Sequence, residues 1–93
     1  MRERDVEAAV CMFAKTLGVI PLKLASANNR GQPDRAFFFS GRTLFLEFKA
    51  PGCRPTDLQI RWLKRLTEAG FKATWVDSIP EGKRLIHDLV QDT

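Results

Sequence analysis

A short run near the middle of the chain, "LFLEFKA" at residues 44–50, places an acid and a base two residues apart in an otherwise apolar segment. Side chains repeat every two residues along a strand, so Glu47 and Lys49 project from one face. A second acid, Asp34, stands in "GQPD", where a turn leads into the preceding apolar run. If the two runs form a hairpin with its tip at 41–42, Asp34 lies at the same open end as Glu47 and Lys49.

Carboxylates gathered beside a lysine suit the hydrolysis of a phosphodiester bond. Crowded carboxylates repel one another, and a divalent cation such as Mg²⁺, or Mn²⁺ in its place, relieves that repulsion through hard oxygen ligands. Asp34 and Glu47 would bind the metal, and the backbone carbonyl of Phe48 could add a ligand. Lys49 would position the nucleophile or neutralise developing charge. An ordinary solvent-exposed ion pair of Glu47 and Lys49 is the alternative that these two residues alone leave open.

A third acid, Glu7, lies about a quarter turn off the apolar stripe of the first predicted helix. From that position its carboxylate could look along the sheet surface and bind a second metal ion or orient its water. The alternative is a solvated pair with Arg4 or Lys15, and Glu3 and Asp5 are close enough in sequence to compete for the same role.

The elements that must position these side chains follow from hydrophobic spacing and turn residues. They are helices at 3–17, about 57–69 and 80–91, and strands at 19–26, 35–40, 43–50 and 72–78. Pro21 favours an edge position for the first strand. The predicted fold class is α/β: a small mixed four-stranded sheet flanked by helices, in the order α-β-β-β-α-β-α, with an antiparallel hairpin and a right-handed parallel crossover.

Length and composition fit this small fold. The chain has 93 residues, 44% of them hydrophobic, which is enough for one compact core, and we expect residues 1–93 to form a single domain. The formal net charge of +4 suits a phosphate-bearing partner. Two cysteines and one histidine show no zinc-ligand spacing, so we expect reduced thiols and a cytoplasmic location. We also expect no signal peptide and no membrane span.

The motifs resemble those of a known family. "GQPD", then twelve residues, then "EFK" is similar to the signature of the PD-(D/E)xK nuclease superfamily. Within that superfamily, residues 5–79 resemble the VRR-NUC family in its short stand-alone virus-type form. That family has a G-x-P-D turn, an E-x-K strand, a P-x-x-x-Q helix start and a glycine before the last strand. The matching residues here are Gly31, Pro33, Asp34, Glu47, Lys49, Pro55, Gln59 and Gly70.

This resemblance implies a PD-(D/E)xK restriction-endonuclease-like core and a Mg²⁺- or Mn²⁺-dependent DNA endonuclease. Relatives include enzymes similar to Holliday junction resolvases and others that act on flaps or ends. The resemblance implies catalytic roles for Asp34, Glu47 and Lys49. It favours Glu7 as the acid of the first helix, and it gives Gln59 the task of orienting Lys49 or a phosphate. The expected location is the cytoplasm of a bacterial cell, or of the host if the protein is viral.

The resemblance also implies a twofold homodimer, which would help so small a domain to bury apolar surface. Trp75 of the fourth strand and the apolar residues of the last helix offer more apolar surface than one short sheet edge needs to be covered. We therefore expect them to form the dimer surface. The other residues of this set are Ile79, just before that helix, and Leu85, Ile86, Leu89 and Val90 within it.

Several polar side chains outside the acid set are candidates for DNA contact, although each has an ordinary explanation as a solvated residue. They are Ser26, Arg30, Arg54, Arg61, Lys64 and Arg65. An alternative from another class is a nucleic-acid-binding module without catalysis, acting within a larger helicase or restriction assembly. A third is a metal-free structural domain, in which the site acids would be scattered in space.

Overall fold

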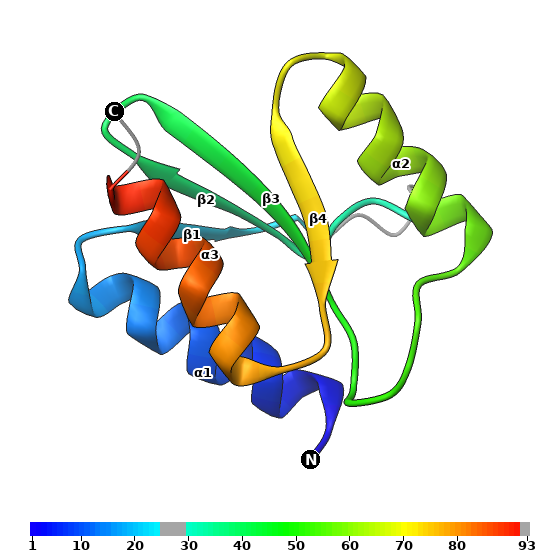
Figure 1. Ribbon diagram of the computed structural model, residues 1–93, viewed down its shortest axis with the longest axis horizontal. Coiled ribbons are helices and arrows are strands. Elements are labelled where there is room, and N and C mark those ends of the chain that lie inside the picture. Colours follow the sequence, from blue (N-terminus) through cyan, green and yellow to red (C-terminus); the bar gives the residue numbers. More distant parts are fainter. Residues whose placement is uncertain (25–29, 92–93) are drawn as a thin grey trace.

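The computed structural model describes residues 1–24 and 30–91, and within them it confirms the predicted order of elements. A four-stranded sheet is flanked by helices in this part of the chain (Figure 1). The elements are α1 (Glu3–Thr16), β1 (Ile20–Lys23), β2 (Arg35–Phe39), β3 (Arg42–Phe48), α2 (Asp57–Glu68), β4 (Lys72–Val76) and α3 (Ile79–Gln91). None of the described helices is long and apolar enough to cross a membrane.

The strands lie in the order β1-β2-β3-β4, antiparallel up to β3 and parallel between β3 and β4. Pro21 stands in β1, at the sheet edge, as its missing N–H requires. The N–H of Leu24 donates to the carbonyl of Asp34 at 3.0 Å, which makes this a hydrogen-bonded pair. Such pairs alternate with non-hydrogen-bonded ones in an antiparallel ladder. The pair of Pro21 and Phe37 is therefore of the second kind, and the nitrogen of Pro21 faces away from β2.

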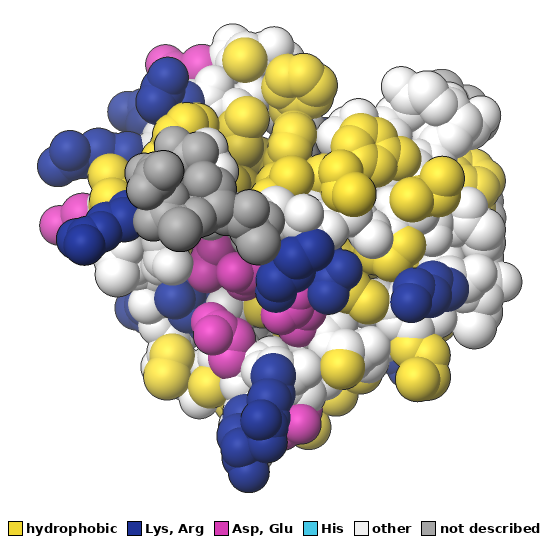
Figure 2. Space-filling model, turned by 180° about the vertical axis from the view of Figure 1, so that it is seen from behind, with side chains coloured by type: hydrophobic (Ala, Val, Ile, Leu, Met, Phe, Trp, Pro, Cys, Tyr) yellow, Lys and Arg dark blue, Asp and Glu magenta, His cyan; other side chains and the backbone are white. Residues whose placement is uncertain are grey.

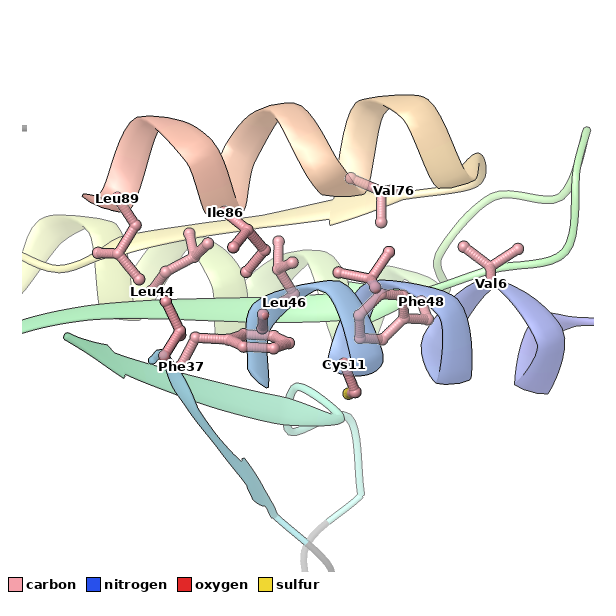
Figure 3. Packing of buried hydrophobic residues seen from close by; sticks show 12 residues of the cluster. Val6, Cys11, Phe37, Leu44, Leu46, Phe48, Val76, Ile86 and Leu89 are labelled. Atoms are coloured by element: carbon pink, nitrogen blue, oxygen red, sulfur yellow. The ribbon is translucent and has the colours of Figure 1, made fainter. Parts of the chain in front are cut away.

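One face of the sheet carries the core and is covered by α1 and α3. Four strand side chains that point to this face, Phe37, Leu44, Leu46 and Phe48, are buried against apolar residues of the two helices (Figure 3). The apolar residues of α3 that were predicted to be in excess therefore pack within the same chain. Its residues Ile86 and Leu89 are buried in this core and are not available for a dimer contact, whereas Leu85 and Val90 pack against the core and keep part of their surface exposed.

The opposite face of the sheet is only partly covered, because α2 lies beside β4. Glu47 projects from this face, since it alternates with the buried Leu46 and Phe48. Over β1 and β2 the same face stays open, and Ile20, Leu22 and Phe38 are exposed there. Figure 2 shows this side of the molecule, with apolar side chains above a group of acidic ones. The sheet thus presents its acids on the face that the core leaves free.

The tip of the β2–β3 hairpin is Ser40–Gly41, one residue earlier than the predicted 41–42. Both tip residues have positive φ, 50° and 78°, which is the backbone that a tight two-residue hairpin turn requires. Arg42 instead belongs to β3 and pairs with Phe39, and its guanidinium lies over that ring. The shift of the tip still leaves Asp34 and Glu47 together at the open end of the hairpin.

Candidate active site

Three carboxylates meet at the open end of the hairpin. Glu3, Asp34 and Glu47 each offer an oxygen, and these oxygens lie within 4.8 Å of one another. Arg35 pairs with Leu46, so one step further Asp34 comes opposite Glu47, as the hairpin predicted. Glu3 reaches them from the first turn of α1. The acids are therefore gathered, which argues against the scattered arrangement of a metal-free structural domain.

Glu47 is the buried member of this cluster, with only 2% of its surface exposed. Its Oε2 accepts a hydrogen bond from Gln59 Nε2 at 3.0 Å and lies 3.5 Å from Lys49 Nζ. Its other oxygen, Oε1, is buried and has no hydrogen-bond partner among the described residues. A buried acceptor without a partner is costly, and a cation would supply one. The carboxylate oxygens of Glu3, Asp34 and Glu47 are hard donors, and their grouping fits a divalent metal ion.

The electrostatics of the cluster agree with this fit. Burial, reinforced by the negative charge of Asp34, raises the pKa of Glu47 to about 7, although Lys49 offsets part of the effect. Burial likewise raises the pKa of Asp34 above its ordinary value, against the hydrogen bond at 2.8 Å that its Oδ2 accepts from the N–H of Phe48. Both carboxylates are thus held in surroundings that disfavour their charged forms until a positive charge arrives.

Lys49 bridges two of the acids. Its Nζ lies 3.8 Å from Glu3 and 3.5 Å from Glu47, and its side chain is 16% exposed. The backbone N–H of the same residue donates to the carbonyl of Val76, which anchors this end of β3 to β4. The backbone N–H of Phe48 donates a hydrogen bond to Oδ2 of Asp34. Lys49 and the N–H of Phe48 therefore lie beside the cluster, and the metal-ligand role of the Phe48 carbonyl stays a prediction.

Gln59 joins the site through Glu47, whereas the sequence predicted a contact with Lys49 or a phosphate. Its side chain closes a capping box at the start of α2, where its Oε1 accepts from the N–H of Thr56 at 2.8 Å. Its Nε2 is then left to donate to Glu47. One side chain thus fixes the helix start and the orientation of the buried carboxylate.

Glu7 lies outside the cluster of three. Its Oε2 instead accepts hydrogen bonds from Lys23 Nζ at 2.9 Å and Arg35 Nε at 2.7 Å. The predicted acid of the first helix is thus replaced in the cluster by Glu3, one helical turn earlier. Helical spacing puts both acids on the same side of α1, and it does not tell which turn meets the end of β3.

The predicted DNA-contact residues that the structure describes are all exposed. Figure 2 shows lysine and arginine side chains on either side of the acids. The guanidinium of Arg65 stacks at 4.5 Å over the ring of Trp62, and that of Arg54 lies 6.0 Å from Trp75. The exposed residues are Arg30, Arg54, Arg61, Lys64 and Arg65, and Ser26 lies outside the described residues.

Comparisons with known proteins place the chain in a family. No family model matches the sequence. The chain is 35% identical over 79 residues to "Putative nuclease p44" of Acyrthosiphon pisum secondary endosymbiont phage 1, and the match covers 84% of this chain and 85% of that protein. It also resembles a solved structure described as a VRR_NUC domain, with a TM-score of 0.81, 25% identity and coverage of 91% and 94% of the two chains. The fold, the spacing of the site residues and these relatives agree, and the chain belongs to the VRR-NUC family of nucleases.

Proposed function

We propose that this nuclease is a Mg²⁺- or Mn²⁺-dependent DNA endonuclease that acts on branched DNA such as four-way junctions. The observation that carries the metal dependence is the buried, unpartnered Oε1 of Glu47 inside a cluster of three carboxylates. Glu3, Asp34 and Glu47 would hold the ion. Bound there, a divalent ion would lower the pKa of a water molecule and offset the charge of the scissile phosphate.

The residues of the chain then divide the remaining work. Lys49 holds a positive charge 3.5 Å from Glu47, where it can orient the attacking water or balance the charge that grows on the phosphate oxygens. Gln59 keeps Glu47 in one orientation through its 3.0 Å hydrogen bond. Attack of the water oxygen on phosphorus breaks one P–O bond, so one site cuts one strand.

The preference for DNA shape over DNA sequence is supported by the basic side chains around the site. The exposed arginines and lysine of α2 are suited to contact phosphates, which carry no sequence information. None of the described helices presents the arginine and asparagine pattern of a helix that reads bases in the major groove.

A cleavage assay on defined substrates tests the proposal. Junction, flap, nicked duplex and single-stranded DNA are incubated with Mg²⁺, Mn²⁺ or EDTA, beside the variant Glu47→Gln as a matched control. We expect metal-dependent cuts by the wild type, preferentially in the junction, and none by the variant. Binding without cleavage in either metal would overturn the proposal and favour a non-catalytic binding module. Equal cleavage of all four substrates would remove the preference for branches.

A further inference from the structure

Beside the carboxylate cluster lies an ionic group of one acid and two bases. Oε2 of Glu7 accepts hydrogen bonds from both Lys23 and Arg35, at 2.9 and 2.7 Å. Lys23 and Arg35 are direct partners in the β1–β2 ladder, and the acid reaches them from α1. Three separate elements therefore meet at this group, which nothing in the cleavage chemistry above requires.

The arrangement carries an electrostatic cost that a purely structural group would avoid. Side chains of paired residues in an antiparallel ladder lie close together, and like charges there destabilise the sheet. A single Glu7 stands against two cations, so the group keeps one net positive charge. Glu7 is 13% exposed, Arg35 24% and Lys23 51%, so the acid is the inner member and the bases face outward.

The guanidinium of Arg35 is held in a particular way. Its Nε is the atom that bonds Glu7, and its terminal nitrogens make no hydrogen bond to the described residues. Burial would raise the pKa of Glu7, but the hydrogen bonds from Lys23 and Arg35 lower it below its ordinary value, so the acid stays ionised and holds both bases. The free edge of a guanidinium fits two oxygens of a phosphate.

This group lies within electrostatic reach of the acids. Arg35 follows Asp34 directly in the chain, and both Glu7 and Lys23 contribute to the pKa of Asp34, in opposite directions. Arg35 pairs with Leu46, so its side chain points to the side of the sheet that α1 covers, the side from which Glu3 reaches the carboxylates. A strand whose scissile phosphate lay at the carboxylates would bring a neighbouring phosphate to these bases.

We propose that Lys23 and Arg35 form a binding site for a backbone phosphate next to the scissile one, and that Glu7 is a positioning residue for both bases. This inference rests on the proposed nuclease function, because it takes the carboxylate cluster as the place of the scissile phosphate. It assigns to Glu7 a task other than metal binding.

DNA affinity in EDTA tests the phosphate site without cleavage or metal. The logarithm of the binding constant falls linearly with the logarithm of salt concentration, with a slope of about −0.9 for each phosphate neutralised. Lys23→Ala should therefore make the slope less steep by about 0.9, because it leaves the group without net charge, and the double variant with Arg35→Ala should flatten the slope no further, because only one phosphate contact is lost. The matched control is Lys83→Ala, which removes the same charge from α3, where Lys83 lies over the ring of Phe13. An unchanged slope in Lys23→Ala, or an equal change in the control, overturns the phosphate site.

The variant Glu7→Gln distinguishes a role of Glu7 in positioning the two bases from a role in binding metal. We expect Mn²⁺ affinity, measured by calorimetry, to stay within about twofold of the wild type, because the three acids of the cluster remain. Turnover on DNA should fall, because Lys23 and Arg35 lose the carboxylate that positions both of them. Loss of Mn²⁺ affinity as large as that in Asp34→Asn would instead make Glu7 a ligand and overturn its positioning role.

The two proposals fail in different ways. If the wild type cuts nothing with either metal, the proposed endonuclease function fails, while the salt slopes in EDTA still decide whether the two bases bind phosphate. If the wild type cuts and the slopes do not move, the endonuclease stands and the phosphate site is refuted.

Discussion

The buried charge of Glu47 makes the metal-free protein sensitive to pH in a direction opposite to that of most salt-bridged carboxylates. Its pKa in the fold is about 7 against an ordinary 4.5, so the fold binds this proton more tightly than the unfolded chain does. The resulting stability is fully present below pH 4.5 and is lost as pH rises towards 7. At about 1.4 kcal/mol for each pH unit, the loss amounts to about 3 kcal/mol.

Glu47→Gln keeps the shape of the side chain but replaces the carboxyl group with an amide, which does not titrate. Relative to the wild type, the variant should gain about 3 kcal/mol in its free energy of unfolding between about pH 4 and about pH 8. Urea unfolding in EDTA, followed by the fluorescence of Trp62 and Trp75, measures the difference at each pH. Saturating Mg²⁺ at the upper pH should then stabilise the wild type and leave the variant unchanged, because a ligand stabilises the state that binds it.

Glu81→Gln is the control. Its hydrogen bond and charge pairing with Arg84 lower the pKa of Glu81 below its ordinary 4.5, so in this case the wild type should gain on the variant as pH rises to about 4.5, the opposite sign, and the difference should then stay constant up to about pH 8. A difference between wild type and Glu47→Gln that stays constant within about 0.5 kcal/mol over the whole range would refute the reasoning. It would mean that the buried carboxylate keeps its ordinary proton affinity.

Three further outcomes follow from the site and the fold. Lys49→Ala should lose cleavage yet bind DNA almost as well in EDTA, because binding is spread over many phosphates; cleavage within about tenfold of wild type removes Lys49 from the mechanism. Asp34→Asn should stay folded and lose Mn²⁺ affinity by calorimetry; unchanged affinity would place the metal elsewhere. Gly82→Ala should cost about 1–3 kcal/mol in a thermal melt, since its Cβ would run into Val10; an unchanged melting temperature would mean that α1 and α3 can separate there.

The dimer implied by the family resemblance remains a separate prediction. Light scattering without DNA decides it, and we expect about twice the monomer mass of 10.6 kDa. A mass that stays at the monomer value as concentration rises would end the idea. With α3 used in the core, the open face over β1 and β2, where Ile20, Leu22 and Phe38 are exposed, offers apolar surface for such a contact.

The fold could be predicted because its signals are local. Alternating apolar residues predicted β2 and β3, and hydrophobic spacing with turn residues predicted the helices, so the predicted order of elements matches the observed one. Asp34, Glu47 and Lys49 could also be placed together, because hairpin register is set by the strands themselves. Each of these inferences needs only neighbours in the sequence.

What could not be predicted depends on how distant elements dock. Glu3 and Glu7 stand on the same side of α1, and only the position of that helix along the sheet decides which one meets Asp34. Gln59 has a pattern typical of a capping box, but its bond to Glu47 depends on how α2 packs beside β4. The burial of Ile86 in the chain's own core, rather than at a dimer contact, likewise depends on how α3 packs against α1.

Pro21 has a consequence for how copies of the chain meet. The exposed edge of a sheet is a template on which another strand can add, and this is a common route to aggregation. Because the nitrogen of Pro21 faces outward from β1, the centre of that edge offers no N–H to an incoming strand. The long side chain of Lys23, two residues after Pro21 in β1, adds a positive charge at the same edge. A continuous eight-stranded sheet formed by joining two β1 edges is therefore disfavoured, and copies that associate through this side must meet face to face.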